Sequence, residues 1–145
     1  VFGGVPHRLQ YLLTENGVRY YNDSKATDIE ATQTALDSFH EPTIWLAGGL
    51  DRGDDLTRLI PNLSHVKLVI AFGETQQKVV AIARQAHKPV ITVTSVKEAV
   101  PVAISSSSAG DVVLLSPAAA SWDQYPNFEV RGDEFVNELK ENLGV

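Results

Sequence analysis

The chain has 145 residues, a net charge of -6 at pH 7 and no cysteine. This length is typical of one domain with a buried core, and the acidic balance, without a basic stripe, argues against a nucleic-acid surface. The missing thiols exclude disulfides and thiolate zinc sites and fit a reducing cytoplasm, and no apolar run approaches the ~20 residues of a membrane span.

In chain order, the pattern first predicts a hairpin, because the apolar and aromatic runs 9–14 and 18–21 flank Asn16 and Gly17, a strong turn signal. A helix then follows Asp28 and runs to about residue 37. The remaining elements are strands at 43–47, 67–72, 89–93 and 111–115 and helices at 55–60, 74–86, 95–104 and 133–142. Ser95 and Glu98 form a capping-box signature at the start of one of these helices.

The alternation of strands and helices predicts an α/β fold. We expect a doubly wound, mostly parallel, Rossmann-like sheet with helices on both faces and the hairpin as an antiparallel edge. No linker, repeat or low-complexity segment divides the chain, so residues 1–145 are expected to form a single domain. The chain contains no methionine, which favours a fragment of a longer protein.

Two polar segments follow predicted strands. Residues 21–28 (Tyr-Asn-Asp-Ser-Lys-Ala-Thr-Asp) come after the run 18–21, and residues 116–135 come after the run 111–115. Open α/β sheets bind their ligands at the carboxyl ends of strands. The hydroxyl, lysine and carboxylate groups of these segments suit a small, charged, oxygen-rich ligand.

These segments resemble the carboxy-terminal domain of the Mur ligases. The matching elements run in order through almost the whole chain: Gly4-Val-Pro-His-Arg8, Asn22-Asp-Ser-Lys-Ala-Thr27, Ala47-Gly-Gly-Leu-Asp-Arg52 and Arg131-Gly-Asp-Glu-Phe135. The run Ser-Pro-Ala-Ala-Ala-Ser-Trp-Asp-Gln-Tyr at 116–125, with Phe-Glu-Val-Arg-Gly at 128–132, is similar to the members that add D-glutamate. The chain departs from the family pattern at two positions, since relatives often have Cys at position 119 and Lys at position 52.

The resemblance implies a set of residues that bind the substrate D-glutamate. These are Lys25, Thr27, Arg52, Ser121, Trp122 and Phe128. In this interpretation the two cations neutralise carboxylates, the hydroxyls add directional hydrogen bonds, and Phe128 bounds the pocket. No catalytic residue and no metal ligand is expected in this domain.

The resemblance also implies a nucleotide-facing seam formed by His7, Arg8 and Asp23. Arg8 would meet phosphate, and Asp23 would meet a ribose hydroxyl or a neighbouring cation. ATP and Mg²⁺ are the cofactors of the complete ligase, with their main sites on upstream domains. The implied partners are D-glutamate, ATP or ADP, UDP-N-acetylmuramoyl-L-alanine and those upstream domains, with neither nucleic acid nor membrane among them.

The implied reaction is ATP-dependent amide formation in peptidoglycan precursor synthesis in the cytoplasm. ATP phosphorylates the carboxylate of UDP-N-acetylmuramoyl-L-alanine, and the amine of D-glutamate attacks the acyl phosphate. Residues 1–145 would be the C-terminal, amino-acid-binding domain of a three-domain ligase and would close over the nucleotide. Because no Gly-Lys-Ser/Thr loop is present, this chain alone is expected to be inactive.

Other interpretations remain open at this point. The glycines at 48–49 could cradle phosphate or form a tight turn that aims Arg52. Asp28 fits a helix cap, Thr27 fits a cap or a ligand contact equally, and Ser121 could cap a turn. Phe128 and Trp122 are of residue types that are usually found in the core, and Lys25 could be an ordinary solvated lysine. A lone histidine such as His7 usually has a structural role. The spacing of His40, His65 and His87 matches no metal site. The alternative functions are a sister Mur ligase domain for another amino acid, a non-catalytic small-acid-binding module, and an oxidoreductase domain, whose glycine fingerprint is missing.

Overall fold

A six-stranded sheet organises the computed structural model, which describes residues 5–145 and therefore leaves Gly4 of the first matching element outside. The strands are β1 (Gln10–Glu15), β2 (Val18–Asn22), β3 (Thr43–Gly48), β4 (Val66–Phe72), β5 (Val90–Thr92) and β6 (Val112–Leu115). Their order is β1-β2-β6-β3-β4-β5, and only β1 runs antiparallel to its neighbour. The predicted mostly parallel sheet with an antiparallel edge hairpin is confirmed.

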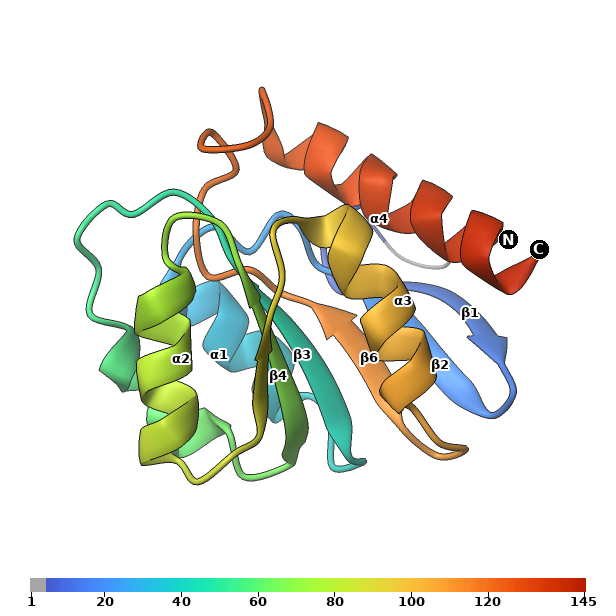
Figure 1. Ribbon diagram of the computed structural model, residues 1–145, viewed down its shortest axis with the longest axis horizontal. Helices are drawn as coiled ribbons and strands as arrows, with labels where there is room; N and C mark the ends of the chain where they lie inside the picture. The colour runs from blue at the N-terminus through green and yellow to red at the C-terminus, as the bar shows by residue number, and fades with distance from the viewer. Residues whose placement is uncertain (1–4) are drawn as a thin grey trace.

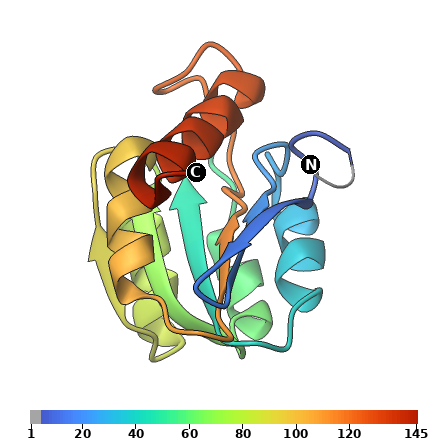
Figure 2. The ribbon, with the colours of Figure 1, turned by 90° about the vertical axis from the view of Figure 1, so that its right-hand side faces the viewer.

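Helices cover both faces of the sheet, as predicted (Figure 1, Figure 2). They are α1 (Ile29–Asp37), the 3-10 helix η1 (Leu56–Asn62), α2 (Gln76–Gln85), α3 (Val96–Ser106) and α4 (Phe128–Leu143). Apolar residues of α1, η1 and α2 pack on one face, and those of α3 and α4 pack on the other. No helix within residues 5–145 is long and apolar enough to cross a membrane.

Strand β3 shows why the sequence specifies two cores. Its side chains alternate between the faces, so Ile44 and Leu46 join the α3–α4 core while Trp45 joins the α1–α2 core. All three side chains are completely buried. A continuous apolar run therefore indicates a strand covered on both sides, as parallel sheets are. The same covering leaves only the strand ends open for a ligand.

The hairpin turn follows the predicted chemistry. Asn16 and Gly17 have φ of 53° and 76°, the left-handed values that a tight two-residue hairpin turn requires. Glu15 and Val18 pair directly across the turn. On its other edge, β2 pairs in parallel with β6, and Asn22 lies opposite Leu115 in that pairing.

Two local predictions were wrong. The last helix begins at Phe128 rather than at residue 133, because Asn127 caps it by accepting a hydrogen bond from the amide of Val130 at 2.9 Å. The capping box at the start of α3 does not form as predicted, since Ser95 makes no side-chain cap bond. Glu98 instead accepts hydrogen bonds from the amide and hydroxyl of Thr94.

Gly132 lies in the second turn of α4, where a glycine normally weakens a helix. A Cβ at this position would lie 2.2 Å from Nδ1 of His7 and 3.0 Å from Nδ2 of Asn22. The glycine therefore permits α4 to cross close over the end of β2 and the segment that precedes β1. In Figure 1, α4 runs across the top of the domain, where the parallel strands end.

Asp23 follows β2 and is only 5% exposed. Its carboxylate accepts hydrogen bonds from the amide of Leu9 at 2.8 Å and from the hydroxyl of Ser116 at 2.8 Å. Burial raises the pKa of Asp23 to about 6, although these two bonds and nearby Arg8 oppose the shift. This carboxylate ties the ends of β2 and β6 to the start of the chain.

Replacing Gly132 by alanine is expected to destabilise the domain by about 1–3 kcal/mol, because the clash with His7 outweighs the ~1 kcal/mol gain in helix propensity. Urea denaturation of the 145-residue chain measures this loss. Adding His7→Ala should recover part of it, since the second change removes the clashing ring. Strictly additive losses in the double variant would contradict this explanation.

Asp23 is expected to make the chain less stable as pH rises from about 4 to about 6. Its pKa is higher in the folded state than in the unfolded state, so the folded state binds more protons in this window. The shift corresponds to a penalty of about 3 kcal/mol, which is fully present above pH 6. The measurement compares the urea midpoints of the wild type and Asp23→Asn at several pH values. The difference between the two proteins should grow across this window, and parallel curves would disprove the effect.

Candidate functional site

A pocket of 270 Å³ opens where the loops after β3 and β6 meet. β3 is followed by β4 and β5 on one side of it in the sheet, whereas β6 returns to its other side. This reversal of strand order is the topological switch point at which open α/β sheets bind ligands. The pocket is lined by Thr27, Arg52, Ala120, Ser121, Trp122, Asn127 and Phe128. Every residue predicted to bind the amino acid lines it, except Lys25.

The loop after β3 forms a tight turn rather than a phosphate cradle. Its backbone amides are engaged within the domain: those of Gly48, Gly49, Leu50, Asp51 and Gly53 donate to Pro117 O, Thr75 Oγ1, Ala120 O, Glu74 Oε1 and Asp51 Oδ1. Amides already bonded in this way are not free to hold phosphate. The turn ends in Arg52, whose Nη2 donates to the carbonyl oxygen of Thr27 at 2.7 Å. The exposed guanidinium thus stands at the pocket with further donors available.

Thr27 faces the pocket because Asp28 takes the role of helix cap. The Asp28 carboxylate accepts a hydrogen bond from the amide of Ala31 at 2.8 Å. Asp28 is therefore the helix cap that the sequence analysis favoured. The Thr27 amide donates to the carbonyl oxygen of Lys25 at 2.9 Å, which folds the chain sharply between these two residues. The Thr27 hydroxyl has no partner among residues 5–145 and lines the pocket.

Ser121 caps a turn through its backbone and leaves its hydroxyl to the pocket. Its carbonyl oxygen accepts hydrogen bonds from the amides of Gln124 and Tyr125 at 3.0 and 2.8 Å. The residue is 2% exposed, and its hydroxyl has no hydrogen-bond partner within the described part of the chain. A hydroxyl that is open to a cavity and has no partner within the domain is available to a ligand.

Two aromatic residues bound the pocket. Trp122 is 64% exposed and so is not a core residue. Phe128 is half-buried and packs edge-on against the ring of His7, with 5.9 Å between ring centroids. Asn127 lines the pocket beside them and was missed from the sequence, because α4 was predicted to start later. An asparagine directly before a run with helical periodicity is a typical helix N-cap, so this pattern could have identified Asn127.

Lys25 lies in a second pocket of 400 Å³ together with Arg8. The lining consists of Arg8, Lys25, Ala26, Asp28, Ala31 and Thr34. Both cations are exposed, so this surface suits an anion. The structure therefore groups Lys25 with the predicted nucleotide-facing Arg8 rather than with the residues at the switch point. Its predicted contact with the amino acid remains a prediction.

His7 is held by other parts of the domain. Its Nδ1 lies 2.9 Å from Nδ2 of Asn22, and its Nε2 lies 3.6 Å from a carboxylate oxygen of Asp133. Its carbonyl oxygen accepts a hydrogen bond from the amide of Lys25. Of the three residues predicted to face the nucleotide, His7 is partly buried and Asp23 is buried, whereas Arg8 is exposed.

The largest hollow, of 490 Å³, lies at the ends of β4 and β5 beside the switch-point pocket. Its polar side chains bond to the domain itself: Asp123 accepts from the Glu74 amide, and Gln124 and Gln76 donate to the carbonyls of Thr94 and Val93. It contains no cationic side chain. The smaller pocket, with a guanidinium and free hydroxyls, is the better candidate for an anionic ligand.

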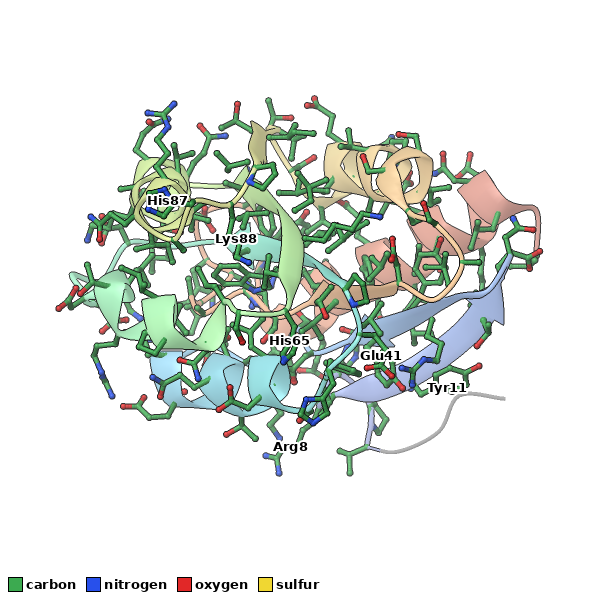
Figure 3. All side chains as sticks on the ribbon, turned by 90° about the horizontal axis from the view of Figure 1, so that it is seen from below. Arg8, Tyr11, Glu41, His65, His87 and Lys88 are labelled. Atoms are coloured by element: carbon green, nitrogen blue, oxygen red, sulfur yellow. The ribbon has the colours of Figure 1, made fainter. Side chains whose placement is uncertain are left out.

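No group of three or more metal-ligating side chains occurs among residues 5–145. His40 and His65 stack edge-on, with ring centroids 5.3 Å apart. His65 precedes β4 and His87 lies shortly before β5, so both are near the amino ends of these strands, in the view from below in Figure 3.

Comparison with known proteins identifies a family that matches this chain. The family model described as "Mur ligase, glutamate ligase domain" matches residues 7–119. The chain is 71% identical over 142 residues to the UDP-N-acetylmuramoylalanine--D-glutamate ligase of Leuconostoc mesenteroides, covering 98% of this chain and 32% of that protein. It is 57% identical over 143 residues to the enzyme of the same name from Lacticaseibacillus paracasei, with 96% and 31% covered. The chain thus spans about a third of the length of these relatives.

Solved structures share the fold at low identity. The UDP-N-acetylmuramate-alanine ligase MurC of Thermotoga maritima superposes with a TM-score of 0.66 at 15% identity, covering 96% of this chain and 31% of that one. The MurF ligase of the same organism, solved in complex with ADP, gives 0.62 at 18% identity, with 97% and 32% covered. The family model and the relatives at 71% and 57% identity show that the chain belongs to the Mur ligase family and matches its glutamate ligase domain.

Proposed function

We propose that this chain is the domain that binds D-glutamate in an ATP-dependent ligase, which joins this amino acid to UDP-N-acetylmuramoyl-L-alanine during peptidoglycan precursor synthesis. The observation that carries the proposal is the switch-point pocket, which combines the Arg52 guanidinium with the unpartnered hydroxyls of Thr27 and Ser121. The names of the highly similar relatives support the choice of amino acid. In this proposal the 145 residues are the C-terminal part of a three-domain enzyme.

The pocket fits a short dicarboxylic amino acid chemically. Arg52 offers a planar set of N–H donors to a carboxylate, and the two hydroxyls add directional hydrogen bonds. Phe128 and Ala120 supply an apolar wall for the methylene groups. Its 270 Å³ lies below the usual range of ~300–1,000 Å³ for drug-sized ligands, which suits an amino acid. Fixing both carboxylates orients the amine, and such orientation can lower a barrier by about 7–11 kcal/mol.

The second pocket would meet the nucleotide. Arg8 presents a cation there, and a nucleotide phosphate is the complementary charge. Lys25 lines the same pocket, and its contact with D-glutamate stays a prediction. ATP supplies the activating phosphoryl group in the proposed reaction. Mg²⁺ is assigned in this proposal to parts of the ligase outside this chain. The proposed setting is the cytoplasm, and the proposed macromolecular partners are the upstream domains of the same ligase, which this domain would close upon.

The test of the function uses the complete ligase that contains this domain. With ATP, Mg²⁺ and UDP-N-acetylmuramoyl-L-alanine, it should form an amide with D-glutamate and not with L-glutamate, L-alanine or meso-diaminopimelate. Preference for another amino acid would indicate a sister ligase. Binding of a small acid without amide formation would indicate a non-catalytic module.

Substitution of Arg52 tests the pocket itself. Removing a hydrogen bond to a charged group costs roughly 1.5–3 kcal/mol, so Arg52→Ala in the complete ligase should raise the half-saturating D-glutamate concentration about ten- to a hundredfold. The values for ATP and the UDP-sugar should stay near those of the wild type. Arg52→Lys should have a mild effect, because lysine is the residue often found here in the family.

The matched control is Arg58→Ala. Arg58 is an exposed arginine in the following helix η1, pairs with Glu30 and does not line the pocket. Its loss should leave the dependence on D-glutamate unchanged. If Arg52→Ala behaves like this control, the pocket is not the amino-acid site.

Trp122 provides a direct report of occupancy. The chain contains two tryptophans, of which Trp45 is completely buried and Trp122 is 64% exposed at the pocket. Acrylamide should therefore quench Trp122 selectively. In a ligase variant whose tryptophans outside this domain are replaced, D-glutamate should reduce the quenching, and Trp122→Phe should abolish the change. Quenching that is insensitive to saturating substrate would argue against a ligand beside Trp122.

A further inference from the structure

Arg131 is an arginine with no exposed surface in the first turns of α4. Its Nε donates to the hydroxyl of Ser24 at 3.0 Å, and its Nη2 donates to the carbonyl oxygen of Ser24 at 2.8 Å. Its Nη1 donates to the carbonyl oxygen of Ala119 at 3.0 Å. One guanidinium thus bonds both the segment after β2 and the segment after β6.

The buried charge of Arg131 has no carboxylate partner within ion-pair distance among residues 5–145. Burial lowers its pKa to about 10, and the negative charge of Asp123 opposes this shift, so the group stays protonated at neutral pH. An uncompensated buried charge is costly, and here backbone carbonyl dipoles replace the missing anion. A methionine or leucine would avoid the buried charge but would remove the donors to the carbonyls of Ser24 and Ala119, so the role of the arginine lies in these bonds.

The bonded segments are those that form the switch-point pocket. Ser24 precedes Thr27 by three residues, and Ala119 precedes Ser121 by two. The guanidinium also abuts the loop that carries Arg52, since a Cβ on Gly49 would lie 3.1 Å from Nη1 of Arg131. Arg131 therefore bonds to the base of two of the loops and lies close to the third, although it does not line the pocket.

We propose that Arg131 is a positioning residue for the amino-acid site: its rigid fork sets the distance between the Thr27 segment and the Ser121 segment, and hence the width of the pocket. This role rests on the proposed function of the pocket. It requires the planar geometry of a guanidinium, since the bonds to Ser24 and Ala119 leave from different nitrogens. Lysine has the charge but a single nitrogen, so it cannot make both sets of bonds in the same directions.

The experiment uses the complete ligase with Arg131→Met and Arg131→Lys. The matched control is Leu139→Ala, which removes a completely buried side chain of the same helix at a distance from the pocket loops. Hydrogen exchange without ligand is measured first. Peptides covering 23–28, 48–53 and 116–127 should exchange about tenfold faster in both Arg131 variants, because the bonds between these loops open more often. The control should not show this change in these peptides.

The kinetic measurement follows at a temperature at which every variant is folded by circular dichroism. A misplacement of about 1 Å can cost about a hundredfold, so kcat/KM for the amino acid should fall about ten- to a hundredfold in both Arg131 variants. The KM for UDP-N-acetylmuramoyl-L-alanine should stay near the wild-type value. Leu139→Ala should retain kcat/KM for the amino acid, which separates positioning from loss of helix packing.

Three outcomes would overturn the proposal: unchanged exchange in both Arg131 variants, unchanged kcat/KM for the amino acid, or an equal kinetic defect in Leu139→Ala. Full activity of Arg131→Lys would also overturn the requirement for the fork. If the wild-type ligase adds an amino acid other than D-glutamate, the proposed function fails. The kcat/KM of the Arg131 variants and of Leu139→Ala for that other amino acid then still tests the role of Arg131. If Arg131→Met does not fold, Arg131→Lys carries the test alone.

Discussion

Strand β6 enters the sheet between β2 and β3, both of which end more than 60 residues earlier in the chain. The segment after β6 therefore emerges between the ends of two other strands and is bonded to both. The amide of Ala118 donates to the carbonyl of Ala26, and the carbonyl of Ala120 accepts from the amide of Leu50. Because these bonds are between backbone groups, they fix the loops without using the side chains. Those side chains remain free to face a ligand, which is how a site built on a rigid scaffold is prepared.

Polar groups near the pocket divide into two kinds. Buried groups such as Asp23, Ser24 and Arg131 are satisfied within the domain, and no buried side-chain nitrogen or oxygen among the described residues lacks a partner. The hydroxyls of Thr27 and Ser121, in contrast, are open to the cavity and have no partner within residues 5–145. The buried network stabilises the loop positions, while the open hydroxyls retain the capacity to bind. A ligand would therefore meet groups that need no rearrangement.

The sequence pattern predicted the sheet and the helices on both of its faces. The family resemblance pointed to five of the residues that line the switch-point pocket, and their binding of D-glutamate stays a prediction. Apolar runs such as 44–47 identify strands covered on two faces, and polar residues after such runs identify the ligand end of the sheet. The sequence pattern failed at the start of α4. The Asn127 cap is a local signal that was missed. Gly132, in contrast, depends on a contact distant in sequence, since its missing Cβ admits the ring of His7, which lies more than a hundred residues earlier in the chain.

The family resemblance, not the residue spacing, grouped Lys25 with Thr27 as contacts of the amino acid. Residues two apart in an extended segment face the same side, but this segment is not extended. The bond from the Thr27 amide to the Lys25 carbonyl turns the chain between them, so the two side chains enter different pockets. The segment is held on one side by the bond from the Lys25 amide to the His7 carbonyl, and on the other by the bond from Arg52 to the Thr27 carbonyl. Because the two pockets share this short segment, the hydrogen bonds that place Lys25 beside Arg8 also set the position of Thr27 relative to Arg52.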